Sequence, residues 1–306
     1  MGAKLNINLF IIGVEKAGTT ALFRHIAQAP IVHAHMQSEM FYFLSDDEFQ
    51  KGPEYALEKY FQGHEKKYVV AKSVMQINSP DAMLRLKKEC PDVKCIIMLR
   101  EPAARAYSAY NYAVMRGAEN CATFEEALAL EDERLKKDSK PNNPLLYISN
   151  STYAPKIKTA LDIFGADNVL IIYHEEYKRD PRKQLARIEA FTGENLFENV
   201  NFNFASHNRA AKAKYPWLAR LSYRFFESRA PIKRFFRALL PHDKANKIRH
   251  ALMNFNRVEL PYRPMNAATA LKIRTKLTTD RDDLIKLIGY CPWEGTGIIE
   301  QNETNS

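Results

Sequence analysis

The chain alternates short apolar runs with longer segments whose apolar residues recur at helical spacing, and this alternation continues through its first two-thirds. A short, nearly continuous apolar run is typical of a strand buried on both faces. The predicted strands are Leu5–Ile12, Ile31–His35, Tyr68–Lys72, Lys94–Leu99 and Asn168–Tyr173. Strands that alternate with helices predict an α/β fold with a central parallel sheet flanked by helices.

Capping residues mark where several helices should begin and end. Ser79-Pro80-Asp81 and Asp180-Pro181 each place an N-cap before a first-turn proline. Thr123 and Glu126 have the spacing of a capping box. Helices of ordinary length are expected to end at three glycines, Gly117, Gly165 and Gly193.

The length of 306 residues favours one large domain over residues 1–306, with a helical C-terminal part at about 215–300. Residues 139–151, with Pro141 and Pro144, predict an irregular loop. A later segment is rich in Arg, Lys and Phe, as in residues 224–226 and 233–237. This composition is typical of a core-packing helix with a basic outer face and, less often, of a helix on a membrane surface. A peripheral membrane contact is therefore left open.

The composition is that of a globular protein with a basic surface. Hydrophobic residues make up 46% and charged residues 26%, which argues against extended disorder. The net charge of +9 and the pI near 9.2 suit an anionic ligand, nucleic acid or a membrane surface. A basic solvated surface explains the charge alone equally well.

The sequence contains no recognisable membrane-spanning or secretory segment. No stretch approaches the roughly 18 apolar residues of a spanning helix, and no basic segment precedes an apolar core near residue 1. We therefore expect a cytoplasmic location. The four cysteines lack C-x-x-C spacing and nearby histidines, which favours reduced structural thiols and predicts no metal site.

The most informative stretch is the turn after the first predicted strand, residues 13–20, which reads G-V-E-K-A-G-T-T. A strand, a glycine turn and a helix N-terminus form an anion cradle, because free backbone N–H groups and the helix dipole point at the ligand. Glycine turns without a ligand are common, but here Lys16, Thr19 and Thr20 lie in the same turn. The turn predicts a phosphate or similar anion.

This turn differs from a triphosphate-binding loop in the place of its lysine. The spacing of Gly13 and Gly18 is that of G-x-x-x-x-G-K-[ST], but the lysine position of that motif is Thr19, and Lys16 lies three residues earlier. The fourth predicted strand is followed by Arg100, where a triphosphatase often has a magnesium-associated aspartate. Both differences argue against a magnesium-triphosphate ligand.

The order K-x-G-T-T after a strand resembles the 5′-phosphosulfate loop of the sulfotransferases that use 3′-phosphoadenosine 5′-phosphosulfate (PAPS). The resemblance implies a P-loop-like three-layer fold and a reaction that needs no metal ion. It also implies that Lys16 offsets charge on the leaving phosphate. The residues implied to bind the 5′ end of the donor are Lys16, Ala17, Gly18, Thr19 and Thr20.

A second stretch, residues 95–110, is similar to the family's 3′-phosphate motif, L-R-x-P-x-x-R-x-x-S-x-Y. The resemblance implies that Arg100 and Ser108 hold the ribose 3′-phosphate, for which the fork of arginine donors is suited. Without the first motif, an ion pair for Arg100 and a packing role for Ser108 would be the simpler interpretation. Arg105 is expected to be structural. The joint occurrence of both motifs makes the resemblance specific.

The predicted general base is Glu39. Residues 38–43 are similar to the glutamate-plus-aromatic segment of heparan-sulfate-type and bacterial sulfotransferases, in which the glutamate acts as base. Ser38 stands where those relatives often have lysine. His33 and His35 compete for the role, because cytosolic small-molecule sulfotransferases use histidine. Their spacing places both on one face of a strand.

Three further lysines complete the predicted site. Lys72 ends a predicted strand where relatives place a lysine close to the transferring group, although a solvent-facing lysine is the simpler alternative. Relatives also send a basic residue from a late loop to the 3′-phosphate. Residues 208–215 offer several choices, of which we name Lys212 and Lys214.

The sequence thus predicts a transferase that moves a sulfuryl group from PAPS to a hydroxyl or amine and releases adenosine 3′,5′-bisphosphate. The acceptor is left open between carbohydrate, lipid and small natural product, and no oligomeric state is predicted. The alternative enzyme is a nucleotide or sugar kinase with a diverged phosphate loop. A non-enzymatic nucleic-acid- or membrane-binding protein is a third hypothesis; we expect no nucleic-acid partner.

Overall fold

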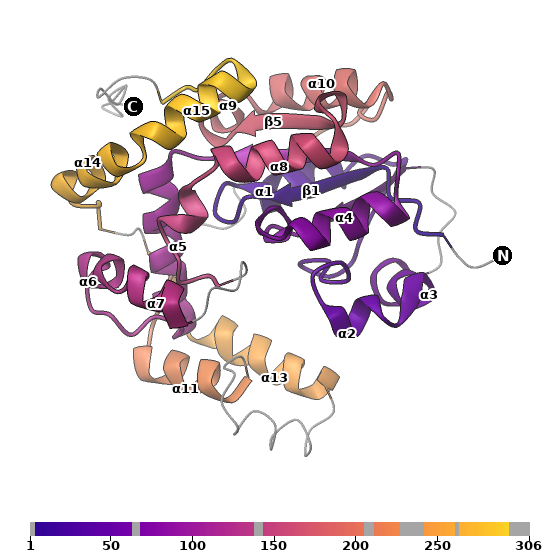
Figure 1. Ribbon diagram of the computed structural model, residues 1–306. Helices are drawn as coiled ribbons and strands as arrows, with labels where there is room; N and C mark the ends of the chain where they lie inside the picture. Colours follow the sequence, from indigo (N-terminus) through magenta and orange to yellow (C-terminus); the bar gives the residue numbers. More distant parts are fainter. Residues whose placement is uncertain are drawn as a thin grey trace.

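A five-stranded parallel sheet forms the centre of the computed structural model, which describes residues 4–62, 68–137, 143–204, 211–226, 242–260 and 263–293 (Figure 1). The strand order is β2-β3-β1-β4-β5, so β1 lies in the middle. The strands are β1 Leu9–Gly13, β2 Val32–Ala34, β3 Tyr68–Lys72, β4 Lys94–Leu99 and β5 Val169–Tyr173. The predicted α/β fold is confirmed.

Helices cover both faces of this sheet. The chain passes from β1 through α1 (Thr19–Ile26) to β2, and from β3 through α4 (Pro80–Glu89) to β4 in the opposite direction across the sheet. Right-handed crossovers therefore place α1 and α4 on opposite faces. In Figure 1, α4 and α8 (Ala154–Phe164) lie together in front of β1, and α15 (Thr278–Ile288) packs against α8. The fold has the predicted three layers.

The remaining elements extend around the sheet and beyond its carboxyl end. The strands β6 (Ala211–Ala213) and β7 (Arg257–Glu259) form a short antiparallel pair, and β6 packs against α5 (Pro102–Arg116). The other helices and strands are α2 Asp46–Phe49, α3 Gly52–Ala56, a π-helical turn Leu57–Phe61, 3₁₀ turns Gln76–Asn78, Ser149–Ser151 and Ala166–Asn168, α5 Pro102–Arg116, α6 Phe124–Ala129, α7 Glu131–Lys137, α9 His174–Arg179, α10 Pro181–Thr192, β6 Ala211–Ala213, α11 Pro216–Phe226, α13 His242–Phe255, β7 Arg257–Glu259 and α14 Ala267–Lys276. A single domain over 1–306 stays a prediction.

The predicted strands agree with the structure at β3 and β4 and are too long elsewhere. β1 begins at Leu9 rather than Leu5, because the Asn8 side chain, not a backbone carbonyl, accepts the Val69 N–H at 2.8 Å. Leu5 is nevertheless buried, so its apolar side chain belongs to the core although the residue lies outside the strand. β2 omits Ile31, which is exposed. β5 begins one residue later than predicted, after a 3₁₀ turn.

The predicted caps are confirmed. The side chains of Ser79, Thr123 and Asp180 accept N–H groups from the first turns of α4, α6 and α10, and Thr123 forms the full capping box with Glu126. The three predicted glycines follow the last residues of α5, α8 and α10. Local sequence signals therefore set most helix ends that border the sheet.

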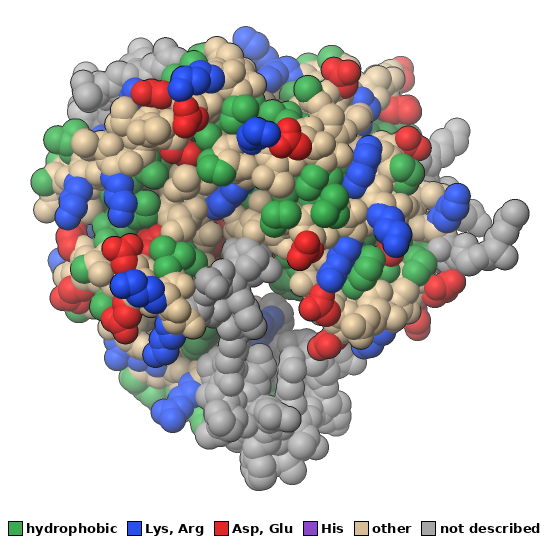
Figure 2. Space-filling view, viewed as in Figure 1, with side chains coloured by type: hydrophobic (Ala, Val, Ile, Leu, Met, Phe, Trp, Pro, Cys, Tyr) green, Lys and Arg blue, Asp and Glu red, His purple; other side chains and the backbone are tan. Residues whose placement is uncertain are grey.

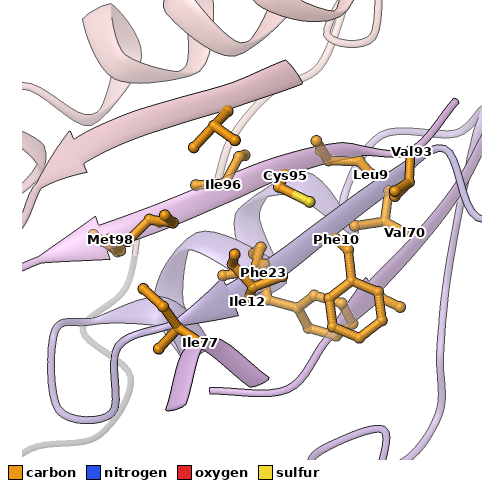
Figure 3. Close-up of a cluster of buried hydrophobic side chains, with 14 of the residues drawn as sticks. Leu9, Phe10, Ile12, Phe23, Val70, Ile77, Val93, Cys95, Ile96 and Met98 are labelled. Atoms are coloured by element: carbon orange, nitrogen blue, oxygen red, sulfur yellow. The ribbon is translucent and has the colours of Figure 1, made fainter. Parts of the chain in front are cut away.

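The main core holds β1 and the loop after it. Figure 3 shows side chains of β1 packed against those of β4 and α1, and the β1 residues Leu9, Phe10 and Ile12 have no exposed surface. Burying one such side chain stabilises the fold by about 1.5–3 kcal/mol. The turn after β1, for which anion binding is predicted, is thus held by a well-packed part of the molecule.

A second apolar cluster fixes α5 beyond the carboxyl end of the sheet. Ala103, Ala106 and Ala109 are buried along α5, where small side chains let α14 pack closely. Phe124 and Tyr147 complete the cluster. The helix that carries Ser108 is therefore rigidly connected to the end of β4.

Candidate active site

The predicted site residues lie around the carboxyl ends of the parallel strands. Lys16 follows β1, Glu39 follows β2, Lys72 ends β3 and Arg100 directly follows β4. In open parallel sheets, ligands bind outside the carboxyl ends of the strands, where crossovers leave in opposite directions. β1 and β4 are such a pair in this sheet.

The turn after β1 has the backbone shape of an anion cradle. Lys16 and Gly18 adopt left-handed backbone conformations, with φ of 68° and 90°. A side chain on Gly18 would come within 2.8 Å of His174 Nδ1, so only glycine fits there. Gly18 is the N-cap of α1 and provides no side-chain cap, which leaves the N–H groups of Thr19 and Thr20 without intrahelical partners. These amides can bind an anion.

The ends of β4 and β5 brace this turn. Arg100 Nη1 donates a hydrogen bond to the Lys16 carbonyl at 3.2 Å, and His174 Nδ1 donates to the Ala17 carbonyl at 3.0 Å. Tyr153 in turn donates its hydroxyl proton to the Arg100 carbonyl at 2.8 Å. Burial lowers the pKa of both Arg100 and His174. The two predicted anion motifs therefore meet at one place.

The Lys16 ammonium lies 4.0 Å from the centre of the Tyr112 ring, on α5. Burial lowers the pKa of Lys16 to about 8; the neighbouring Glu15 carboxylate opposes this shift, and the charge of Arg100 adds to it. The aromatic face holds the cation without neutralising it. Lys16 is thus a desolvated cation beside the anion cradle.

Glu39 and Lys72 form a partly buried ion pair, in which Lys72 Nζ donates to Glu39 Oε1. Glu39 Oε2 accepts the Val74 N–H at 2.9 Å. Lys72 is 2% exposed, so its simpler interpretation as a solvent-facing lysine is wrong. Burial raises the pKa of Glu39, and the charge of Lys72 only partly offsets this rise. A carboxylate with a raised pKa is a better proton acceptor near neutral pH.

His35, one of the two competing histidines, is less suited to the role of base. Burial, together with the charge of Lys72, lowers the pKa of His35 to about 3. A base of such low pKa holds a proton poorly at neutral pH. His33 is partly buried, with its ring 5.9 Å from that of Phe61. The electrostatic environment favours Glu39.

The residues predicted for the 3′-phosphate lie on or beside α5. Ser108 is partly buried in this helix, and β6, which contains Lys212, packs against it. Lys214 is exposed, with its Nζ 5.2 Å from the centre of the Tyr215 ring. Residues 208–210, which were also considered, lie outside the described residues. The roles of Ser108 and the two lysines stay predictions.

Arg105 is structural, as expected. Its Nε donates to Ser151 Oγ at 2.6 Å and its Nη2 donates to the Tyr147 carbonyl at 2.7 Å. These bonds tie α5 to the turn at residues 149–151. Of the predicted irregular loop, residues 143–151 are described and contain this turn, whereas 139–142 lie outside the described part.

Besides His174, four charged or aromatic residues near the cradle were not predicted from the sequence. Glu15 lies in the turn itself, and burial lowers the pKa of Arg249 on α13 with Arg116 as the neighbouring charge. Tyr112 and Arg116 are four and eight positions after Ser108, which places all three on one side of α5. Extending the Arg100 to Ser108 motif along that helical face is the signal that would have found them.

The basic character of the sequence is not gathered into one patch on the face seen in Figure 2, where Lys and Arg alternate with Asp and Glu. On α11, Trp217 is 64% exposed. An exposed tryptophan is compatible with a peripheral membrane contact, so this hypothesis stays a prediction. Residues 233–237 of the Arg/Phe-rich segment lie outside the described residues. No helix within the described ranges is long and apolar enough to cross a bilayer. The cytoplasmic location stays a prediction.

Among the residues that the structure describes, no three His, Cys, Asp or Glu side chains converge as metal ligands would.

The fold and the site together define an α/β protein of P-loop-like fold with a glycine turn between β1 and α1. A family model described as the sulfotransferase domain matches residues 6–256, and the chain belongs to this family of enzymes. Family membership sets aside the nucleotide or sugar kinase. The chain resembles the crystal structure of a sulfotransferase from Alicyclobacillus acidocaldarius with a TM-score of 0.57 and 26% identity, over 77% of this chain and 96% of that one.

Two curated relatives are enzymes named for heparan sulfate. The chain is 24% identical to the bifunctional heparan sulfate N-deacetylase/N-sulfotransferase 1 of Caenorhabditis briggsae, over 68% of this chain and 24% of the relative. It is 27% identical to the heparan sulfate glucosamine 3-O-sulfotransferase 5 of Mus musculus, over 59% of this chain and 51% of the relative. The chain thus spans about a quarter of the first relative and about half of the second.

Proposed function

We propose that this protein transfers a sulfuryl group from PAPS to a hydroxyl or amine of an acceptor, with Glu39 as general base. The observation that carries the proposal is the bond from Arg100 to the Lys16 carbonyl, since it joins the two motifs that would hold opposite ends of one nucleotide. A doubly phosphorylated adenosine needs two anion sites within one cleft, and the contact between the two motifs supports such a cleft.

The residues present fit the proposed donor. The N–H groups at the start of α1 and the Lys16 ammonium suit the 5′-phosphosulfate, with Ala17, Gly18, Thr19 and Thr20 providing the backbone. Arg100 and Ser108 suit the 3′-phosphate, with Lys212 or Lys214 as the late basic residue. The desolvated state of Lys16 and Arg100 supports anion binding, because an incoming phosphate restores partners to two partly buried cations.

Catalysis then depends on positioning and charge. The acceptor oxygen or nitrogen forms a bond to sulfur while the bond from sulfur to the bridging phosphate oxygen breaks, and its electron pair leaves with the phosphate. Glu39 takes the acceptor proton. Lys16 stabilises the charge on the leaving phosphate. The Lys72 ammonium favours the ionised form of Glu39 before the reaction. When Glu39 becomes protonated, the Lys72 ammonium is freed to interact with the sulfuryl oxygens.

The acceptor class is the finer part of the proposal. The two relatives named for heparan sulfate support a carbohydrate, and lipid or small natural products are the other candidates. A change of acceptor would leave the donor site and the Glu39–Lys72 pair in the same roles.

Binding of adenosine 3′,5′-bisphosphate is the direct test. We expect a ligand concentration a hundred times Kd to stabilise the protein by about 2.7 kcal/mol. For a chain of this length this raises Tm by roughly 5 °C. Adenosine 5′-monophosphate, which lacks the 3′-phosphate, should raise it much less. Labelled sulfate should pass from PAPS to a mixture of acceptors. An unchanged Tm at saturating bisphosphate would remove the proposed donor.

Binding should also weaken as the pH rises through about 8. Below that pH Lys16 carries a proton and a positive charge, and above it the free enzyme loses this charge. Calorimetric titration of the bisphosphate between pH 6.5 and 9.5 would measure the change in Kd. Lys16→Arg is the matched control, because a guanidinium stays protonated throughout this range. A similar loss of affinity in wild type and Lys16→Arg would assign the titration to another group.

A further inference from the structure

A small pocket lies beside the anion cradle, between α5 and α11. It has a volume of about 190 Å³, and its walls include Glu15, Ala109, Tyr112, Ala113, Arg116 and Tyr223. This is the volume of roughly six water molecules. The pocket therefore has room for a small ring rather than for a second nucleotide. Glu15 connects it to the cradle, since Lys16 is the next residue in the chain.

Glu15 is an unusual residue for an anion-binding turn, because its charge repels a phosphosulfate. Its carboxylate is close enough to influence the pKa of both Lys16 and Glu39. Its Oε2 is buried and has no hydrogen-bond partner in the described part of the chain. A buried hydrogen-bond acceptor without a donor costs folding free energy, and a ligand that supplies the donor removes that cost.

The phosphosulfate end of PAPS cannot donate a hydrogen bond to Glu15. Phosphate and sulfate oxygens at neutral pH accept hydrogen bonds and do not donate them. A hydroxyl-bearing acceptor has donors to offer. The partner of Glu15 is therefore most simply the second substrate, held beside the group that reacts at Glu39.

The other walls describe the shape of that substrate. Tyr223 presents aromatic surface, and the alanines of α5 leave space. Arg116, whose Cζ lies 5.4 Å from the centre of the Tyr112 ring, provides a fixed set of donors. Aromatic surface combined with charged hydrogen-bonding groups suits a ring that is apolar on its faces and hydroxylated at its edge.

We propose that Glu15 and this pocket form an acceptor subsite for one neutral, hydroxylated six-membered ring. Glu15 accepts a hydrogen bond from a ring hydroxyl that is not sulfated, Arg116 donates to another ring oxygen, and Tyr223 contacts a face of the ring. This inference rests on the proposed function and assigns Glu15 as a specificity-determining residue.

The test uses methyl β-D-glucopyranoside as the probe, with 2-(hydroxymethyl)tetrahydropyran as a ring of the same size that lacks ring hydroxyls. Sulfate transfer from labelled PAPS to each is measured for wild type, Glu15→Gln, Glu15→Ala and the surface control Asp162→Asn. We expect both Glu15 variants to lose roughly 10- to 100-fold in kcat/KM for the glucoside, mainly through KM. The hydroxyl-free ring should be a poor acceptor for all four proteins alike, and Asp162→Asn should match wild type.

Thermal shifts with adenosine 3′,5′-bisphosphate separate this inference from the proposed function. At pH 6.5, where Lys16 stays protonated even without the supporting charge of Glu15, the Glu15 variants should keep the wild-type shift or exceed it, because Glu15 repels phosphate. A reduced shift would place Glu15 in the donor site and overturn the subsite. A wild-type KM for the glucoside in Glu15→Gln, or no transfer to the glucoside by a wild-type protein that binds the bisphosphate, would overturn it too. A wild-type protein without any shift would overturn the proposed function, and the subsite with it.

Discussion

Replacing Glu39 with glutamine is expected to lower kcat by about 10²- to 10⁴-fold, because Glu39 is the carboxylate that pairs with Lys72 and takes the acceptor proton in the proposed mechanism. The thermal shift with adenosine 3′,5′-bisphosphate should remain close to that of wild type, since Glu39 contacts β3 and Val74 rather than the anion cradle. Single-turnover transfer of labelled sulfate measures the chemical step directly. Loss of bisphosphate binding together with turnover would make Glu39 a structural residue.

Because Glu39 pairs with Lys72, the effect of Glu39→Gln on activity has to be separated from its effect on stability. The single change leaves the Lys72 ammonium buried without its partner, which costs roughly 3–5 kcal/mol. Combining Glu39→Gln with Lys72→Met removes that unpaired charge, so the double variant should regain much of the lost Tm while remaining inactive. If activity returned along with stability, folding rather than proton transfer would explain the single variant. His35→Gln, which changes the competing base, should retain most of the turnover.

Replacing Lys16 with methionine is expected to lower kcat/KM for the donor by about 10²- to 10³-fold, the usual effect of removing one preorganised charge stabiliser. The loss should appear in kcat as well as KM, because the charge on the leaving phosphate grows during the reaction. Methionine keeps the length and the contact with the Tyr112 ring, so Tm without ligand should be unchanged or higher.

Two companion variants define what Lys16 does. Lys16→Arg should retain part of the activity, because it keeps the charge but changes its geometry. Arg100→Lys should weaken bisphosphate binding more than binding of adenosine 5′-monophosphate. Equal losses for both nucleotides in Arg100→Lys would mean that Arg100 acts through the loop alone and does not contact the 3′-phosphate.

The sequence predicted the sheet well and its strand ends less well. β3 and β4 are bounded by residues whose polarity changes at both ends, so pattern and structure agree there. At β1 the apolar pattern begins at Leu5, but the strand begins at Leu9. The Val69 N–H binds the side-chain oxygen of Asn8 instead of a backbone carbonyl. A pattern of hydrophobic residues cannot predict this hydrogen bond. Helix ends were predicted correctly because a cap is a local interaction of a few residues.

The site shows the same division. Lys16, Arg100, Glu39 and Lys72 were found because each follows a strand in a recognisable motif, and the structure brings them to one edge of the sheet. That Glu39 pairs with Lys72 depends on β2 and β3 lying side by side, which the motif does not state. His174 was missed because its contact with the Ala17 carbonyl joins residues far apart in the chain.

The anchoring of α5 bears on how new specificities arise in this protein. Buried alanines and the bonds of Arg105 fix the first half of the helix, while the pocket residues Ala113 and Arg116 lie in its second half. Mutations at the far end can therefore change the shape of the pocket without tilting the helix or moving Ser108. Divergence toward different sulfate acceptors would then accumulate at those outer positions, while the nucleotide end of the same helix stays constant.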